Sequence, residues 1–380
     1  MRSLQGLLRV PLGFVPRNAL SFSVDPAPEK YPTPEQQHAF HRALGERLRA
    51  LPGVEAVGAV HNRPLEYGPI GSDTWVGVEG QPLDQVSVTR NSISANWEAA
   101  TPDYFRAVGT RLLEGRAFVE ADSADAPRVV IVSRGLAQRA WPGESALGKR
   151  LHTYPAKAEL KDGRFVDVEW QTVVGVVEDA RYRGIQNPRL DVYLPYGQVS
   201  DSLRHVVLRT QGDPLALAGA VREQVRALDP EAGVGDLTTM QRLVDRALTP
   251  WRFAGALLGA FALAAVLLTA SGLFAVLHHF VSGRTREIAI RMALGAEPRR
   301  VRRFVLAQGV GVTAVGVGLG SALSLVLARS LSALLYGLSG RDPWSHLGGA
   351  ALIGIVAVMA SLFPARRAAR VDATVALRSE

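Results

Sequence analysis

The most regular feature of the sequence is a set of long uncharged stretches in its C-terminal third. Residues 253–283, 304–328 and 343–365 contain no Asp, Glu, Lys or Arg, and each is rich in small and aliphatic residues. About 20 predominantly apolar helical residues span the hydrocarbon core of a bilayer, whereas uncharged helices of this length are unusual in soluble proteins. We therefore predict three transmembrane helices, at 253–281, 304–328 and 343–365.

The short segments beside these stretches differ in charge. Seven arginines and two glutamates lie within residues 284–303, and four arginines follow the third stretch, whereas residues 329–342 hold two arginines and one aspartate. Short basic loops stay on the cytoplasmic side of a membrane. This predicts that 284–303 and the C-terminal tail are cytoplasmic and that residues 1–250 are not. The aromatic residues expected at a membrane surface then fall on the outer face: Trp251, Tyr336 and Trp344.

Residues 19–250 alternate strand-like and helix-like patterns, which predicts a mixed α/β (α+β) extracytoplasmic domain. Strand-like runs cover 19–24, 54–60, 86–95, 128–133, 171–179, 191–196 and 204–210, and helix-like runs cover 34–51 and 214–228. The similar segments LRALPGVEAV and VRALDPEAGV indicate either a repeated strand–helix–strand unit or a chance likeness of two amphipathic helices. The amphipathic segment 239–251 leads into the first membrane helix without a flexible linker, so we expect a stiff connection.

Residues 1–18 do not have the pattern of a membrane segment. Arg2, Arg9, Arg17 and two prolines interrupt them, and they contain neither the apolar run nor the cleavage site of a signal peptide. A domain outside the cytoplasm needs a segment that carries it across the membrane. We therefore expect residues 1–18 to be a remnant or linker that follows a membrane helix missing from this sequence.

Composition and charge exclude several kinds of site and partner. Its 380 residues include no cysteine, which excludes disulfides, thiolate metal centres and a cysteine nucleophile. The net charge of +8 lies entirely within residues 253–380, so there is no basic soluble module and we expect no nucleic-acid partner. Residues 143–149 match most of a phosphate-binding loop, but Arg150 stands where Ser or Thr would bind Mg²⁺. A turn before a strand is the better interpretation, and we expect no catalytic residue, metal or cofactor.

Glycines inside the predicted membrane helices form two pairs with GxxxG spacing, Gly255 with Gly259 and Gly316 with Gly320. Such pairs let helix backbones approach closely in lipid, although glycine is also generally frequent in membrane helices. We expect these residues to pack against other helices, supplied by another copy of the chain or by a related module.

The strongest local pattern is the first cytoplasmic segment, RTREIAIRMALGAEP at 284–298. Glu287 and Arg291 are spaced i, i+4 in the favourable order for a helical ion pair. Gly295 suits the position after a helix end, and Pro298 suits the first turn of the next helix. On a helix, one face would hold Ile288, Met292 and Gly295. The pattern predicts a short amphipathic helix at the inner membrane surface, which is either a turn at that surface or a contact site for a cytoplasmic partner.

These motifs resemble those of the FtsX/MacB-type permeases of ABC transporters. RTREIAIRMALGA at 284–296 is similar to the family's coupling segment, R-x-x-E-I-G-I-R-x-A-x-G-A, and the tail at 364–378 is similar to its C-terminal P-A-x-x-A-A-x-x-D-P-x-x-A-L-R. The outer part resembles the family's periplasmic core domain in TPDYFRAVG at 101–109, LEGRAF at 113–118 and VGVVED at 174–179. The likeness covers about residues 10–380 and is greatest to the second half of the acidobacterial duplicated permeases.

The sequence departs from the family in three respects. Ala289 and Ala373 replace a usual glycine and proline, and the helix that precedes the periplasmic domain in the family is missing. The resemblance implies a division of the chain into the remnant at residues 1–18, a periplasmic core domain at 19–250 and a transmembrane domain at 251–380. It also implies that the protein lies in the bacterial inner membrane.

The resemblance also implies a function and partners. A separate cytoplasmic ABC ATPase subunit would bind the coupling residues Arg284, Glu287, Ile288, Arg291, Met292, Gly295 and Ala296. The chain itself would not hydrolyse ATP. It would transmit ATP-driven motion to its periplasmic domain for efflux or for extraction of an envelope substrate, together with another permease module and with a periplasmic adaptor or outer-membrane channel. The alternative is an FtsX-like signalling scaffold that regulates a periplasmic enzyme.

Overall fold

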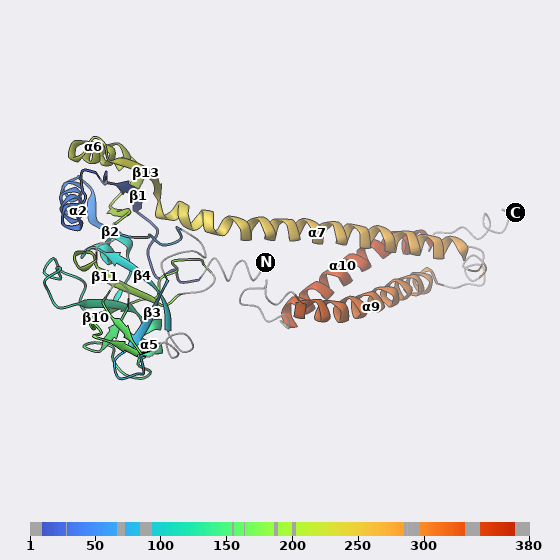
Figure 1. Ribbon diagram of the computed structural model, residues 1–380. Coiled ribbons are helices and arrows are strands. Elements are labelled where there is room, and N and C mark those ends of the chain that lie inside the picture. The colour runs from blue at the N-terminus through green and yellow to red at the C-terminus, as the bar shows by residue number, and fades with distance from the viewer. Residues whose placement is uncertain are drawn as a thin grey trace. The chain divides into compact units, whose positions relative to one another are not determined.

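The computed structural model describes residues 10–27, 29–66, 73–83, 93–153, 156–162, 164–185, 189–199, 203–284, 287, 290, 297–330 and 343–368. The chain divides into two compact units, Arg9–Thr249 and a unit that contains Pro250–Glu380. The first is a mixed α/β domain, as the sequence predicts, and the second is helical in most of its described residues (Figure 1).

One half of the α/β unit is built from two strand–helix–strand segments. The first is β1 (Ala19–Asp25), α2 (Pro34–Arg49) and β2 (Val54–Val60), and the second is β12 (His205–Thr210), α6 (Ala218–Leu228) and β13 (Gly233–Thr239). Their strands pair antiparallel in the order β2–β12–β1–β13, which is the arrangement of a ferredoxin-like βαββαβ fold. The two segments with similar sequence therefore occupy equivalent places in one sheet.

The chain between β2 and β12 forms the second half of this unit. Its strands are β3 (Asp73–Val78), β4 (Ile93–Ala100), β5 (Leu112–Gly115), β6 (Val129–Ser133), β7 (Arg150–His152), β10 (Gln171–Val177) and β11 (Asp191–Pro195). They pair in a closed ring, β4–β11–β6–β10–β7–β3 and back to β4, and β5 adds to β10. Ring closure pairs strand edges that would otherwise be open to other chains. We call this part the inserted ring.

Short elements complete the inserted ring and its surroundings. These are α4 (Tyr104–Val108), α5 (Arg134–Ala140), a hairpin of β8 (Glu159–Lys161) and β9 (Arg164–Val166), and two 3₁₀ turns, η1 (Tyr196–Gln198) and η2 (Pro214–Leu217). Residues before β1 also pack on the α/β unit: Phe14 is buried, and the Val15 amide donates to the Val108 carbonyl at 3.1 Å. The contacts thus place residues from Arg9 onward in this unit.

Local sequence signals explain where the elements begin. At the start of α2 the Gln36 amide donates to Thr33 Oγ1 (3.4 Å), and the Thr33 amide donates to the Gln36 side chain (3.3 Å). This capping box satisfies amides that have no partner inside the helix. Pro34 occupies the first turn, where its missing N–H costs little.

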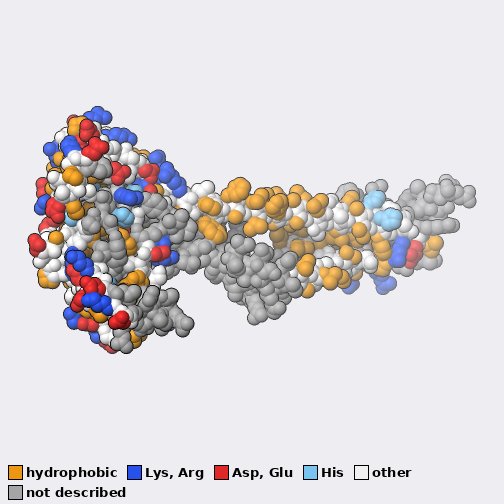
Figure 2. Space-filling view, viewed as in Figure 1, with side chains coloured by type: hydrophobic (Ala, Val, Ile, Leu, Met, Phe, Trp, Pro, Cys, Tyr) orange, Lys and Arg blue, Asp and Glu red, His pale blue; other side chains and the backbone are white. Residues whose placement is uncertain are grey.

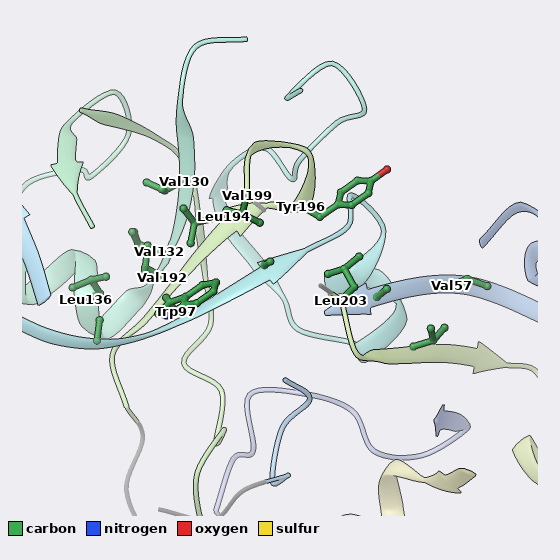
Figure 3. Packing of buried hydrophobic residues seen from close by; sticks show 14 of the residues in the cluster. Val57, Trp97, Val130, Val132, Leu136, Val192, Leu194, Tyr196, Val199 and Leu203 are labelled. Carbon is green, nitrogen blue, oxygen red and sulfur yellow. The ribbon is translucent and has the colours of Figure 1, made fainter. Parts of the chain in front are cut away.

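A hydrophobic cluster joins the two halves of the α/β unit (Figure 3). The two helices contribute Phe40, Leu44, Leu48, Val221 and Val225, and the inserted ring contributes Trp97, Val130, Val132, Val192 and Leu194. In Figure 3 the Trp97 ring lies beside Val192 and Val132. Because both halves bury side chains in the same core, burial of apolar surface holds them together.

The described helices of the second unit are α7 (Met240–Gly283), which starts within the first unit, α9 (Pro298–Ser330) and α10 (Pro343–Ala368). By length and composition, α7 and residues Arg299–Ser324 of α9 could cross a membrane, whereas α10 has a shorter apolar stretch, Leu347–Leu362. Two of the three predicted spans are thus long and apolar enough to cross a membrane. Only 11% of the most apolar window is buried in α7, and likewise in α9, and Figure 2 shows hydrophobic side chains along the helix surfaces.

Candidate functional site

The start of α7 is anchored in the α/β unit. β13 ends at Thr239 and α7 begins at the next residue, and the Arg242 amide donates to Thr239 Oγ1 at 3.2 Å. One face of the first turns is buried, and it consists of Met240, Leu243, Val244 and Leu248. Their spacing of three, four and eight residues follows the helical period. The connection between strand and helix is therefore direct, and residues 240–251 continue into the first long apolar helix without a flexible linker, as the sequence predicts for that segment.

The same helix continues beyond Pro250, where the two units divide. A proline inside a helix removes one backbone hydrogen bond, so Pro250 marks a weak position in an otherwise continuous rod. After it the surface is apolar, and Phe253, Leu258 and Leu268 are 68–72% exposed. Extended exposed apolar surface is typical of regions that contact a membrane or another protein.

The three long helices meet at Gly309 of α9. A Cβ built there would lie 2.7 Å from Ser361 Oγ on α10 and 3.2 Å from Leu277 Cδ1 on α7. The surrounding buried residues are Leu273, Leu277, Val281, Val301, Val305 and Ala357. Sequence analysis did not single out Gly309. Its spacing of four from Thr313, another small residue, is the signal that could have found it.

The glycine pairs named from the sequence lie elsewhere on these helices. Gly255 and Gly259 lie on α7 and Gly316 and Gly320 on α9. Among the described residues, no atom outside the neighbouring backbone of the same helix comes within 4 Å of a Cβ built at Gly259, Gly316 or Gly320. The last two line an apolar cavity of about 680 Å³ between the helices, together with Thr269, Gly272, Val276, Val312, Gly349 and Ile353.

The predicted coupling residues are only partly within the described chain. The Arg284 amide donates to the Val281 carbonyl at 3.2 Å, and its guanidinium lies 4.5 Å from the centre of the Phe280 ring. Glu287 is exposed in a helical conformation, and α9 begins at Pro298, as predicted for that residue. The remaining predicted coupling residues lie outside the described residues: Ile288, Arg291, Met292, Gly295 and Ala296.

Two family models match the chain in the order of its two units. Residues 7–228 match the MacB-like periplasmic core domain, and residues 259–373 match the FtsX-like permease C-terminal region. The first match alone covers more than half of the sequence. The chain belongs to the FtsX/MacB-type permeases. Residues 229–258, which include β13 and the start of α7, lie between the two matched regions.

Curated relatives of this FtsX/MacB-type permease are longer proteins. The chain is 26% identical over 304 residues to the macrolide export ATP-binding/permease protein MacB of Hahella chejuensis, covering 76% of this chain and 44% of that protein. It is 27% identical over 282 residues to the pyoverdine export ATP-binding/permease protein PvdT of Pseudomonas putida, covering 70% of this chain and 40% of that protein. The chain thus spans less than half the length of these relatives.

Solved structures also resemble this permease. The periplasmic region of MacB from Actinobacillus actinomycetemcomitans has a TM-score of 0.39 and 14% identity, over 64% of this chain and 97% of that one. The extracellular domain of the noncanonic ABC-type transporter YknZ has a TM-score of 0.35 and 13% identity, over 57% of this chain and all of that one.

The periplasmic core domain of this permease buries an acidic cluster where β4 and β11 pair in parallel. Glu98 accepts hydrogen bonds from the Asn62 amide (2.7 Å) and from Asn96 Nδ2 (3.1 Å), and Asn96 also donates to Asp191 Oδ1 (3.3 Å). Arg183 donates to Asn96 Oδ1 at 2.9 Å. Asp191 Oδ2 is buried without a hydrogen-bond partner among the described residues. The cluster links the end of β2 to two strands of the inserted ring.

Burial raises the pKa of both acids. The pKa of Glu98 rises to about 8 because desolvation disfavours the carboxylate, and this outweighs the hydrogen bonds from Asn62 and Asn96. Burial and the neighbouring Glu98 raise the pKa of Asp191 as well. Both groups therefore tend to stay protonated in the folded domain. Sequence analysis missed this cluster, because neither acid stands in a recognisable motif.

The segment that resembles a phosphate-binding loop is a turn in this permease. Gly143 and Gly148 have positive φ angles, Lys149 pairs with Glu144 at 2.7 Å, and β7 begins at Arg150. Across the described ranges, no group of three or more His, Asp or Glu side chains is arranged to hold a metal ion.

Proposed function

We propose that this chain is the permease part of a MacB-like ABC system, in which it transmits ATP-driven motion from the cytoplasm to its periplasmic core domain. The observation that carries the proposal is the continuity of α7. A single helix of 44 residues has its first turns buried in the α/β unit and continues as an exposed apolar helix. Pro250 removes one backbone hydrogen bond from this helix, but the remaining helical turns keep it stiffer than a loop, so it transmits displacement better than a flexible connection does.

The membrane arrangement forms part of the proposal. Residues 253–281, 304–328 and 343–365 would cross the bacterial inner membrane, with 284–303 and the tail inside. The exposed apolar surfaces of α7 and α9 support two of these spans. The basic character of 284–303 supports the orientation, since short basic loops stay cytoplasmic. The α/β unit would then lie in the periplasm.

The ATPase would be a separate cytoplasmic subunit that binds the coupling segment around Glu287. The MacB and PvdT relatives are named as ATP-binding/permease proteins, and the part of the chain that matches them carries the permease families. The transported cargo would leave the cell by efflux or be extracted from the envelope, with a periplasmic adaptor or outer-membrane channel as partner.

A further permease module would complete the membrane part. Gly316 and Gly320 face an apolar cavity and have no close helix neighbour among the described residues. Small residues of this spacing let a further helix approach closely in lipid. We propose that these glycines, with Gly255 and Gly259, pack against helices of a second copy or of the other half of a duplicated permease.

Affinity purification of the full chain, expressed from its own locus, tests the proposal. We expect an ABC ATPase to co-purify and its ATP hydrolysis to be stimulated by the chain. Glu287→Lys and Gly295→Leu should abolish the stimulation while the protein still reaches the membrane, because both alter the predicted partner surface. Glu297→Lys, at an exposed acidic residue just before α9, is the matched control and should retain it.

Two results would overturn the proposal. One is the absence of any co-purifying ABC ATPase. The other is full stimulation by both coupling variants. If the ATPase binds but the co-purified periplasmic partner is a cell-wall enzyme rather than an adaptor or channel, the FtsX-like scaffold becomes the better interpretation.

A further inference from the structure

Asp236 lies in a β-bulge shortly before α7. Thr238 pairs with Ser21 and Gly235 pairs with Ser23, so two residues of β13, Asp236 and Leu237, stand opposite one residue of β1. Asp236 has φ +38°, which is uncommon for a residue other than glycine. Bulges turn a strand and redirect a side chain. The bulge thus gives Asp236 a defined orientation next to the helix start.

The Asp236 carboxylate contacts Arg63, whose side chain is fully buried. Arg63 Nη2 donates to Asp236 Oδ2, and Arg63 Nη1 donates to the Asp236 carbonyl at 3.4 Å and to Ser21 Oγ at 3.1 Å. Arg63 Nε donates to Glu66. A buried guanidinium is costly unless its charge is paired, so these contacts hold Asp236 in one position.

The second carboxylate oxygen of Asp236 faces α7. Arg246 Nη1 lies 3.7 Å from Asp236 Oδ1, and the Arg246 side chain is 65% exposed. On the other side, Arg63 is next in sequence to Asn62, whose amide donates to Glu98 of β4. An uninterrupted path therefore runs from α7 through Arg246, Asp236 and Arg63 to the inserted ring. We call the first three residues of this path the arginine–aspartate relay.

We propose that Asp236 is a positioning residue that couples displacement of α7 to the inserted ring through the arginine–aspartate relay. This inference rests on the proposed transmission function and assigns residues to it. Asp236 and Arg246 lie in 229–258, between the two matched family regions. Arg246 and Arg63 both pair with the Asp236 carboxylate. When α7 rotates or tilts, the guanidinium of Arg246 moves relative to this carboxylate, which changes the electrostatic interaction between Asp236 and Arg63. The loop 61–66 then responds through Arg63.

Hydrogen–deuterium exchange of the full chain in detergent micelles tests the relay. Arg246→Ala should raise amide exchange in residues 61–66 by about twofold to fivefold, because it removes an exposed ion pair at the far end of the path. Arg242→Ala, at an exposed arginine one turn earlier in α7, is the matched control and should leave residues 61–66 at wild-type rates. In an Asp236→Asn background, Arg246→Ala should have no further effect on these residues.

Salt separates the relay from a purely structural role. In the wild type, about 1 M NaCl should raise exchange in 61–66 because it screens an exposed pair, and in Arg246→Ala the rise with salt should be clearly smaller. Unchanged exchange in 61–66 in Arg246→Ala, or an equal rise in Arg242→Ala, overturns the inference. Because the measurement needs no ATPase, failure of the relay is distinguishable from failure of the proposed function, which the co-purification reports.

Discussion

At the scale of single residues, Glu98 makes the stability of the periplasmic core domain depend on pH. Its pKa is raised to about 8 by burial, from a usual value of 4.5. Between these values the folded domain keeps a proton that the unfolded chain releases. The contribution of Glu98 to the free energy of unfolding therefore falls as the pH rises through this window, and the raised pKa of Asp191 acts in the same direction.

Glu98→Gln should remove the part of this dependence that comes from Glu98. Wild-type protein in detergent should lose stability between about pH 6.5 and pH 8, above the range in which the lowered pKa values of the buried His41 and His205 act in the opposite direction, by on the order of 1 kcal/mol per pH unit. The amide variant should lose clearly less because glutamine does not titrate. Thermal unfolding followed by tryptophan fluorescence measures this. The control is Glu55→Gln, at an exposed position of β2. A wild-type melting temperature that rises with pH over this range would contradict the assignment.

Gly58 is a second residue whose identity the packing requires. A Cβ there would lie 2.4 Å from the Tyr104 Cα, a backbone atom that cannot rotate away. Gly58→Ala should therefore lower stability by about 1–3 kcal/mol, which is roughly 2–10 °C in melting temperature. Gly219→Ala in α6, where a Cβ meets no atom within 4 Å, should raise it slightly, because alanine favours helix. Equal effects of the two changes would refute this explanation.

At the scale of elements, the three long helices depend on their closest contact. Gly309→Leu would force its side chain against Ser361 and Leu277 and should weaken helix packing by about 1–3 kcal/mol. Gly311→Leu, two residues along α9 and without a neighbour within 4 Å, should be tolerated. The melting temperature of each variant in detergent checks the prediction. It is wrong if Gly309→Leu is as stable as Gly311→Leu.

Elements with their own hydrophobic pattern could be predicted from the sequence, and elements that depend on a distant partner could not. β2 and β12 match the predicted runs closely because Val and Ala recur in β2 and Val and Leu recur in β12. β13, GVGDLTT, was missed because it has few apolar residues and depends on pairing with β1. Ring closure between β4 and β11 joins residues nearly a hundred positions apart, and no local pattern indicates such a pairing.

The candidate sites also divide into those that a local sequence pattern indicates and those that depend on distant residues. The coupling segment is recognisable because its residues are contiguous and form a motif. The anchored start of α7 was indicated by the amphipathic pattern at 239–251. No sequence pattern indicated that Arg63 and Glu98 are buried, since charged residues are usually exposed. Both are buried because loops and strands from distant parts of the chain surround them.

At the scale of the whole molecule, the account depends on which side of the membrane each unit occupies. The arginine-rich residues 284–303 would hold one end of the helices in the cytoplasm, and the α/β unit would function in the periplasm. The transmission proposal and the cytoplasmic ATPase partner are compatible only with this arrangement. Sidedness is therefore the central claim.

Because the chain has no cysteine, single introduced cysteines report sidedness most directly. Ala124→Cys in the α/β unit and Arg299→Cys at the start of α9 are both at exposed positions. Each variant would be expressed from its own locus and treated with a membrane-impermeant maleimide in spheroplasts. The account predicts that Ala124→Cys is labelled at once and Arg299→Cys only after the inner membrane is opened. Labelling of Arg299→Cys in intact spheroplasts, with Ala124→Cys protected, would contradict it.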